Sequence, residues 1–278
     1  MKPKILLISL LVLFSFKPND SFSRSTKAIW NKEVNALSIG GQTSTWHYRA
    51  DRLNVNKKSE ALIFLPDHSA PDDMTLIFWF HGCNGYSDRT FDTRLALQLK
   101  KLQEANRSYA LVVPELLWSK NTKTTCSRQG RSFRKAGELV SFVNDSIGRI
   151  NILLRASSRE ILVDPRVVFI GHSAGGSVFK AAALSGDLCK INPSVVVWSD
   201  STYSRWFDYA WKNCLEKGDS DVVVLIRKWT KTWKSFKRSR RGKNTPDFLD
   251  VRYFGGKIYH STIGDNAIEF ADVFPDGC

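Results

Sequence analysis

The sequence predicts an α/β fold built on a mostly parallel central sheet with helices on both faces. Short apolar runs such as 75–80 and 167–170 alternate along the chain with longer segments whose apolar residues recur at helical spacing. Uninterrupted apolar runs are typical of strands buried on both faces of a parallel sheet. No linker-like segment divides the 278 residues, so a single domain is expected.

The strands and helices are assigned in chain order, after a polar N-terminal arm at 24–36. Short apolar runs predict strands at 45–49, 61–65, 75–80, 109–113, 167–170, 195–198, 222–226 and 251–259. A glycine-containing turn at 81–85 closes the third strand, and Pro114 closes the fourth. Apolar spacing or alanine content predicts helices around Leu95, Leu99 and Leu102, at 133–154, 177–184 and 203–215, and close to the C-terminus.

The first 23 residues are interpreted as a cleaved secretory signal peptide. Two lysines precede a run of apolar residues and serines at 5–16, and Ser21 and Ser23 offer the small residues that a signal peptidase reads. That run is shorter than the roughly 20 residues that span a bilayer. We therefore expect a domain at 24–278 that is exported to the periplasm or the extracellular space. An uncleaved N-terminal anchor is the alternative.

The five cysteines fit export but no metal site. No two of them form a CxxC pair, and no cysteine–histidine spacing matches a zinc site, so no metal or other cofactor is predicted. In an oxidising compartment two disulfides are expected, Cys189 with Cys214 and Cys83 with Cys126, which leaves Cys278 as a thiol. Five free thiols are the alternative.

A G-x-S-x-G motif centred on Ser173 predicts a nucleophilic serine. It stands between a predicted buried strand and a predicted helix, where a sharp turn lifts the serine hydroxyl clear of the sheet. Gly171 and Gly175 are expected because strand and helix approach too closely there for side chains, and Gly176 adds room. The backbone N–H of Ala174, beside a helix N-terminus, would point toward the reacting centre.

With this motif the chain resembles the α/β-hydrolase superfamily over nearly all of its predicted domain. Residues 80–83 and 163–167 are also similar, more weakly, to secreted esterases of the polyhydroxybutyrate depolymerase and feruloyl esterase type. The resemblance implies an α/β-hydrolase fold and a second oxyanion-hole donor after the third strand, the backbone N–H of Cys83. His81 is then expected to shape that loop and not to act as the base.

The catalytic base is assigned to His260 by position and elimination. His47 and His68 precede the core strands, His81 belongs to the oxyanion loop, and the side chain of His172 is expected to point away from the serine. His260 directly follows the last predicted strand, which is where the superfamily has its histidine.

The acid departs from the usual pattern of the superfamily. The common position follows the strand 222–226, yet 227–230 holds no carboxylate. Asp200 ends the preceding strand, a position that some members use, so it is the predicted acid, with a helix N-cap before Tyr203 as the structural alternative. Asp247 is the second candidate for the acid, while Asp250 is expected at the wrong end of the sheet.

Basic charge is concentrated in one segment. The net charge is +14, and it becomes +12 when the three lysines and one aspartate of residues 1–23 are removed. The segment that begins at Arg227 and ends at Lys243 holds nine lysines and arginines and no acid, interleaved with Trp229, Trp233 and Phe236. It is interpreted either as a solvated insertion whose aromatic side chains pack on the body of the protein, or as a flap that contacts an anionic substrate, polymer or lipid surface.

These observations predict an exported serine hydrolase of carboxylic esters that acts through an acyl-enzyme. A catalytically inactive protein of the same fold that binds an anionic polymer or membrane surface, and an acyltransferase, are the alternatives. The expected substrate is an ester, either of a small molecule or linked to a polymer. Nucleic acid is not an expected partner, because no nucleic-acid-binding module is recognisable and the chain is expected to be exported.

Overall fold

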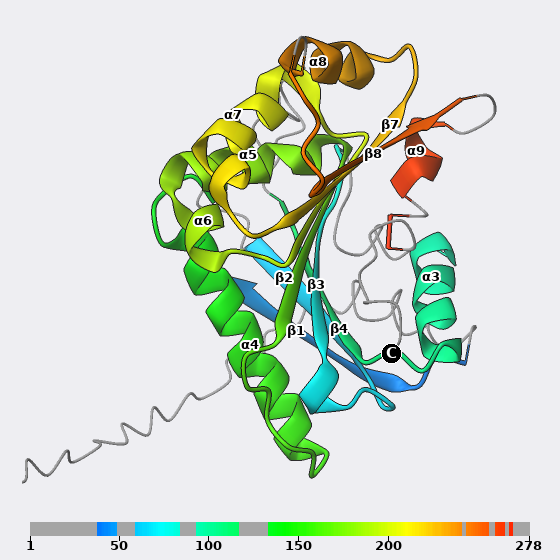
Figure 1. Cartoon of the computed structure of the whole chain (residues 1–278). Coiled ribbons are helices and arrows are strands. Elements are labelled where there is room, and N and C mark those ends of the chain that lie inside the picture. Colours follow the sequence, from blue (N-terminus) through cyan, green and yellow to red (C-terminus); the bar gives the residue numbers. More distant parts are fainter. Residues whose placement is uncertain are drawn as a thin grey trace, which may run out of the picture.

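A computed structural model gives the structure, and it describes residues 38–48, 59–83, 93–116, 133–240, 243–255, 259–264 and 267–268. Eight strands of this part form one sheet: β1 (Gly41–Tyr48), β2 (Ser59–Pro66), β3 (Thr75–Phe80), β4 (Tyr109–Pro114), β5 (Arg166–His172), β6 (Val195–Ser199), β7 (Asp221–Arg227) and β8 (Leu249–Phe254). Their order is β1-β2-β4-β3-β5-β6-β7-β8 (Figure 1). Strands β1 and β2 pair antiparallel at one edge, and all pairs from β4 to β8 are parallel. The predicted mostly parallel sheet is confirmed.

The helices of the described residues connect these strands. They are η1 (Pro71–Asp73), α3 (Thr93–Glu104), α4 (Glu138–Ala156), η3 (Ser173–Gly175), α5 (Gly176–Ser185), α6 (Asp187–Ile191), η4 (Tyr203–Arg205), α7 (Trp206–Asn213), η5 (Leu215–Lys217), α8 (Lys231–Ser239) and α9 (His260–Ile263). Helices α3 and α9 lie on one side of the sheet, and α4 to α7 lie on the other (Figure 1).

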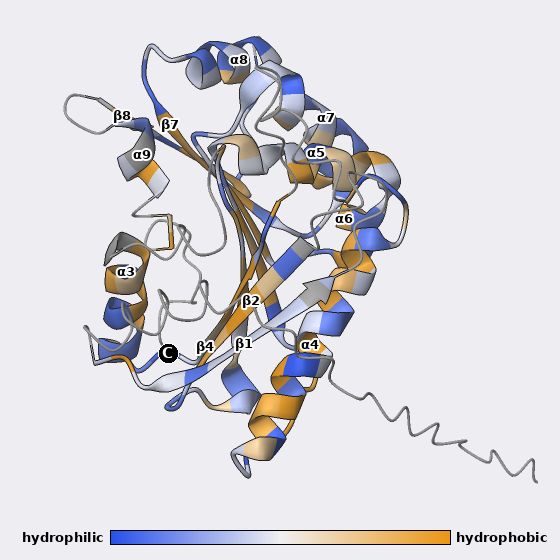
Figure 2. Ribbon diagram, turned by 180° about the vertical axis from the view of Figure 1, so that it is seen from behind, coloured by the Kyte–Doolittle hydropathy of each residue, from blue (hydrophilic) through white to orange (hydrophobic). Residues whose placement is uncertain are grey.

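Two apolar clusters, one on each face, form the core. Along β3 the side chains of Leu76, Phe78 and Phe80 belong to the cluster under α4, α5 and α7, while Ile77 and Trp79 belong to the cluster under α3 and α9. Alternate residues of one strand therefore face opposite layers, which explains why β3 is apolar throughout. The central strands are accordingly coloured as hydrophobic in Figure 2.

Several predicted boundaries are wrong, and the backbone shows why. The helix predicted at 203–215 is divided, because Ser204 and Arg205 have positive φ angles of 43° and 65°. The helix predicted from residue 133 begins only at Glu138, after Gly137 with φ 89°. The last strand ends at Phe254 and not at residue 259. Strand β1 begins at Gly41, four residues before its predicted start.

A buried carboxylate holds the start of α4. Asp187, which is fully buried, accepts hydrogen bonds from the backbone N–H groups of Gly137 at 2.6 Å and Leu139 at 2.9 Å. Free N–H groups at a helix N-terminus favour a negative partner. This contact between α6 and α4 therefore fixes the helix that covers one face of the sheet.

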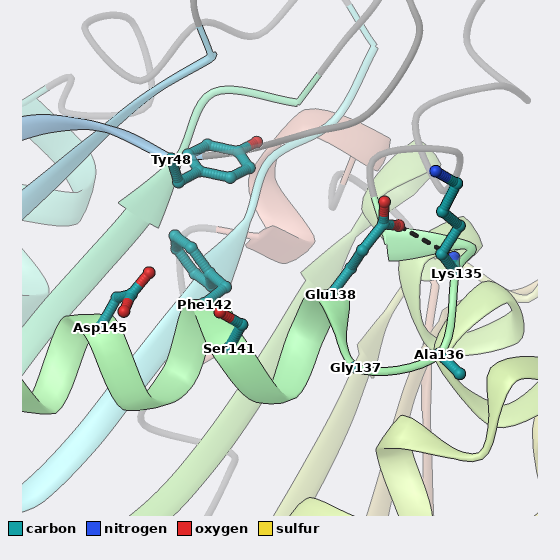
Figure 3. A pocket seen from close by; sticks show the side chains of 8 residues that line it. All are labelled: Tyr48, Lys135, Ala136, Gly137, Glu138, Ser141, Phe142 and Asp145. Atoms are coloured by element: carbon teal, nitrogen blue, oxygen red, sulfur yellow. Dashed lines mark hydrogen bonds between the residues drawn. The ribbon is translucent and has the colours of Figure 1, made fainter.

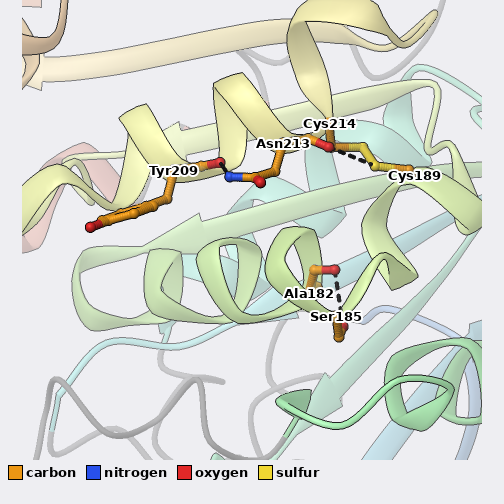
Figure 4. The surroundings of a disulfide bond; sticks show 6 residues. All are labelled: Ala182, Ser185, Cys189, Tyr209, Asn213 and Cys214. Atoms are coloured by element: carbon orange, nitrogen blue, oxygen red, sulfur yellow. Dashed lines mark hydrogen bonds between the residues drawn. A yellow bond between two sulfur atoms is a disulfide. The ribbon is translucent and has the colours of Figure 1, made fainter.

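The predicted disulfide between Cys189 and Cys214 is present. It joins α6 to the end of α7, with the two Cα atoms 5.4 Å apart (Figure 4). Cys83 is also disulfide-bonded, and Cys126, its predicted partner, lies outside the described residues. The signal peptide predicted at 1–23, the arm at 24–36 and Cys278 lie outside them as well. In the part of the chain that is described, no helix is long and apolar enough to cross a bilayer.

Candidate active site

Ser173 lies at a strained turn between β5 and α5. It has a φ of 53°, a left-handed conformation that is uncommon for a residue with a side chain. A Cβ atom at Gly175 would come within 2.1 Å of the carbonyl oxygen of Phe80, and one at Gly171 would come within 2.7 Å of the Phe179 ring. The predicted close approach of backbone around the serine is therefore present, and it requires glycine on both sides.

Three predicted side chains meet at the carboxyl edge of the sheet. The hydroxyl of Ser173 lies 2.7 Å from Nε2 of His260, and Nδ1 of His260 lies 2.5 Å from Oδ2 of Asp200. Because the carboxylate can only accept, Nδ1 carries the proton and Nε2 accepts from the serine. The imidazole is thus oriented with its free lone pair toward the hydroxyl, as a general base requires.

Asp200 is buried at the end of β6, with 1% of its surface exposed. Its φ is 42°, and its backbone N–H donates to the carbonyl oxygen of Leu225 at 2.7 Å, next to the last β6–β7 pairing. The hydroxyl of Thr232, also buried, donates to the second carboxylate oxygen. Both oxygens of the buried acid therefore have a donor.

Thr232 accounts for the missing acid after β7. It belongs to α8, the helix that follows β7. After β7, where the superfamily usually has its acid, this chain has the hydroxyl of Thr232. That hydroxyl donates to Asp200, the acid at the end of β6. Asp247, the second candidate, precedes β8, whose first residue pairs with Val222 at the start of β7. It therefore lies toward the amino ends of the parallel strands, opposite the edge that bears Ser173.

His172 holds the segment that carries His260. Its Nε2–H donates to the backbone carbonyl of His260 at 3.0 Å, and the two rings stack at 5.2 Å between centroids. A Cβ atom at Gly264 would come within 2.9 Å of the His172 ring, so the chain around α9 packs directly on it. The sequence predicted only that His172 points away from the serine. Its contact with the histidine segment could not be read from the motif.

Tyr203 is a site residue that the sequence analysis missed. Its hydroxyl lies 3.4 Å from Nε2 of His260. Burial, together with the negative charge of Asp200, raises the pKa of this phenol above its ordinary value. Tyr203 therefore stays protonated and able to donate. Its position three residues after the acid was the one available signal.

The loop after β3 lies against the serine, as predicted. A Cβ atom at Gly82 would come within 3.1 Å of the Cβ of Ser173. His81 is 2% exposed, accepts from the backbone N–H of Leu116 through Nε2 at 3.0 Å, and donates from Nδ1 to the carbonyl oxygen of Gly82 at 2.9 Å. Burial lowers its pKa to about 4. His81 is therefore a neutral residue that shapes the loop preceding Cys83.

No metal site accompanies this group. In the described ranges no three His, Cys, Asp or Glu side chains cluster so that they could hold a metal ion. A cavity of about 340 Å³ lies beside the first turn of α4 and is lined by Tyr48, Phe142 and Glu138 among others (Figure 3). None of the three residues that meet at the sheet edge lines it, so it is separate from the candidate site.

Comparison with known proteins shows the fold but no near relative. No family model matches the sequence, and no curated protein matches it. An IroE-like serine hydrolase from Shewanella oneidensis is similar in structure, with a TM-score of 0.52 and 16% identity over 84% of this chain and 79% of that chain. A feruloyl esterase module from Clostridium thermocellum, complexed with sinapinate, gives a TM-score of 0.51 and 12% identity over 84% and 87%. Esterase LipW from Mycobacterium marinum gives 0.50 and 11% over 90% and 87%. The chain has the α/β-hydrolase fold, as the motif around Ser173 predicted.

Proposed function

We propose, on the premise of this fold, that the protein is an exported serine hydrolase that cleaves carboxylic esters through Ser173, His260 and Asp200. The observation that carries the proposal is the continuous contact from the serine hydroxyl through the imidazole to a buried carboxylate. Serine, histidine and acid in this geometry form the constellation of acyl-transfer enzymes on several unrelated folds. The proposal therefore rests on the site and not on the fold alone.

In the proposed first step the Ser173 oxygen attacks the acyl carbonyl carbon. Its proton passes to Nε2 of His260 over the 2.7 Å contact, and Asp200 stabilises the imidazolium that forms. The C–O bond to the leaving alcohol then breaks, and Nε2 returns the proton to that oxygen. A water molecule attacks the acyl-enzyme in the same way and releases the acid and the free serine.

The negative charge on the carbonyl oxygen needs donors in place before the reaction. We assign this role to the backbone N–H groups of Cys83 and Ala174, which follow the loop at Gly82 and the nucleophile itself. Each donor of this kind is worth about 3 to 4 kcal/mol of barrier. The close approach of Gly82 to Ser173 supports the assignment of Cys83, because it brings that loop to the reacting centre.

Tyr203 is assigned to the leaving-group side of the serine. Its hydroxyl lies 3.4 Å from Nε2 of His260, the same nitrogen that the Ser173 hydroxyl contacts at 2.7 Å. The departing alcohol and the incoming water must both pass Nε2, so a neutral phenol donor beside it can hydrogen-bond either oxygen. The raised pKa of Tyr203 keeps that donor in place at neutral and mildly basic pH.

The structurally similar proteins support an ester as substrate. Both the feruloyl esterase module and LipW are described as esterases, and the Shewanella protein as a serine hydrolase. An inactive protein of the same fold was favoured by the missing acid after β7. Asp200 in contact with His260 removes that support. Acyl transfer differs only in the acceptor, so product analysis with added alcohols separates it from hydrolysis.

The test is covalent labelling of the purified chain with a fluorophosphonate, alongside hydrolysis of p-nitrophenyl acetate and butyrate. Both signals are expected for the wild type and are expected to vanish in Ser173→Ala. Ser185→Ala is the matched control, because this serine of α5 bonds only its own helix through the Ala182 carbonyl. A folded wild-type protein that neither labels nor turns over these esters would refute the proposal.

Export is part of the proposal and has its own test. Residues 1–23 have the charge and apolar pattern of a signal peptide, and the Cys189–Cys214 disulfide fits an oxidising compartment. Expression of the full chain in a bacterial host should yield a periplasmic or secreted protein whose N-terminus begins near residue 24. A cytoplasmic protein that retains residue 1 would contradict export.

A further inference from the structure

Helix α8 changes the interpretation of the basic segment 227–243. Thr232 and Phe236 are buried on its inner side, against Asp200 and the Phe207 ring respectively. Residues 231–239 of the segment therefore form a helix with a defined inner face, and the packing of Phe236 fits an insertion whose aromatic side chains pack on the body of the protein. The outer face carries the charge, which gives α8 its hydrophilic colouring in Figure 2.

The outer charges of α8 have no ion-pair partner among the described residues. Lys231, Lys234 and Arg238 are exposed and recur at helical spacing, so they share one side of α8. Among the described residues none of them forms an ion pair. Lys237 lies 4.7 Å over the Trp233 ring, a contact that leaves its charge in place. An exposed face with several unpaired charges of one sign favours a ligand with charges of the opposite sign.

A cleft next to this face is large enough to hold part of an anionic ligand. It has a volume of about 760 Å³ and lies between the end of α8, the segment before β8 and β8 itself. Four cationic side chains line it, together with the polar side chains of Thr245 and Tyr253; the cations are Lys237, Arg238, Arg240 and Lys243.

The carboxylates around the cleft only partly offset its charge. Asp250 is paired with Arg252 at 2.7 Å. Glu216 interacts with Arg240, which also lies 4.7 Å over the Trp211 ring, so Arg240 has a structural role as well. Asp247 is exposed in the segment between Thr245 and β8. The remaining three cations face solvent within the described part of the chain.

We propose that this cleft binds an acidic polysaccharide, and that the polysaccharide carries the ester that Ser173 cleaves; the second part rests on the proposed function. The cations continue from the cleft along α8, whose nine residues extend about 13 Å at 1.5 Å per residue. That length exceeds one small anion and suits a chain with repeated carboxylate groups. Hydroxyl groups at Thr245 and Tyr253 supply neutral hydrogen bonds for sugar oxygens.

Other polyanions fit the cleft less well. Single-stranded nucleic acid is bound through aromatic side chains on which successive bases stack. The aromatic side chains that line this cleft are Tyr253 and Phe236, and Phe236 is buried at 3% exposure. A lipid surface requires apolar groups that project from the protein into the headgroup layer. The lining cations instead surround a hollow, and Trp229, which is 77% exposed, precedes α8 and does not line it.

The cleft and the catalytic group share helix α8. Helix α8 supplies Thr232 to the acid and four cations to the outside, counting Lys231, Lys234, Lys237 and Arg238. Strand β8 lines the cleft through Val251 and Tyr253, and α9, which holds His260, is the next described element along the chain. A polymer held in the cleft is therefore close in the fold to the segments that build the site.

The experiment measures binding apart from catalysis. The Ser173→Ala chain is titrated with polygalacturonate oligomers by calorimetry at low and high salt. We expect salt-sensitive binding that weakens at least tenfold when Lys237→Ser, Arg238→Ser and Lys243→Ser are added. The control adds Arg155→Ser, Lys190→Ser and Lys217→Ser, three exposed cations outside the cleft, and should bind like its parent within twofold. Equal loss in both triple variants, or no loss in the first, would overturn the proposed cleft.

Two further measurements test the ligand class and the link to catalysis. Tighter, cleft-dependent binding of an oligothymidylate or of phosphatidylglycerol vesicles would overturn a polysaccharide. In chains with Ser173 intact, the ratio of kcat/KM for acetylated polygalacturonate to kcat/KM for p-nitrophenyl acetate should fall at least tenfold in the cleft variant. An unchanged ratio would overturn the link to an ester-bearing polymer. Binding without any ester hydrolysis would instead refute the proposed function and leave the cleft in place.

Discussion

The hydroxyl of Thr232 provides the most direct test of how the acid is held. Asp200 is 1% exposed, with one oxygen toward His260 and the other toward Thr232. The change Thr232→Val keeps the volume and removes the donor. Because water cannot reach the buried carboxylate, nothing replaces the lost hydrogen bond, and Asp200 is no longer fixed in the orientation that His260 needs.

The expected loss follows from the charge on the acceptor. A hydrogen bond to a charged group contributes about 1.5 to 3 kcal/mol. If this free energy is expressed in the transition state, kcat/KM for p-nitrophenyl acetate falls about ten- to hundredfold. The fall should be mainly in kcat, because Thr232 contacts the acid and not the ester. Fluorophosphonate labelling should slow by a similar factor.

Two companion variants make this prediction decisive. Thr232→Ser restores the hydroxyl without the methyl group and should recover most of the activity. Ser239→Ala removes a hydroxyl of the same helix that bonds only the Phe236 carbonyl, and should behave like the wild type. A Thr232→Val protein with wild-type kcat/KM and an unchanged melting temperature would refute the role of Thr232 in positioning Asp200. So would a Thr232→Ser protein as slow as Thr232→Val.

Three further predictions follow from contacts described above. Tyr203→Phe removes one neutral hydrogen bond of about 0.5 to 1.5 kcal/mol, so kcat should fall about two- to twelvefold, and unaltered turnover would remove the phenol from the mechanism. His81 has a pKa of about 4 in the fold against an ordinary value of 6.5, so the unfolded chain binds more protons between these values. As the pH falls from 7 to 4, the unfolding free energy of the wild type should therefore decrease by about 3 kcal/mol more than that of His81→Gln, with both proteins measured by urea titration. An equal decrease in the two proteins would contradict this prediction. Replacing Cys189 and Cys214 by alanine opens a loop with a sequence separation of 25 and should lower the unfolding free energy by about 3.5 kcal/mol, measured by denaturant titration against the wild type under non-reducing conditions. An unchanged midpoint would show that this bond does not stabilise the fold.

Local sequence was enough for the parts of the site that depend on local geometry. The turn around Ser173 was predictable from five residues because the pattern itself is local: Gly171 meets Phe179 of the helix that follows, although Gly175 meets the Phe80 carbonyl of β3. Strand β3 was predicted to the residue, since burial on both faces makes every position apolar. Two of the element boundaries that failed, at Ser204 and Gly137, lie where a positive φ angle interrupts or precedes a helix.

The missed residues act across the fold. Thr232 is 32 positions from Asp200, and Tyr203 is 57 positions from His260. No periodicity links such pairs, because only the parallel arrangement of β6, β7 and β8 brings their carboxyl ends together. In the sequence Thr232 is one polar residue in a basic segment. Its contact with Asp200 becomes evident only from the structure, in which α8 places Thr232 on its buried side.

The position of α8 explains why the basic charge and the unusual acid occur together. With the acid on β6, the segment after β7 does not have to present a carboxylate, and it is free to form a helix. The inner face of that helix holds the acid through Thr232 and packs Phe236 on the core. Its outer face does not pack on the core or hold the acid, so it can carry cations that line the cleft. The two faces should therefore be separable by substitution: changes at Lys237, Arg238 and Lys243 should alter polymer binding, and changes at Thr232 should alter turnover of every ester. A chain in which neutralising the outer face slowed p-nitrophenyl acetate as much as Thr232→Val does would show that α8 acts as one unit, with the charge needed to keep the acid in place.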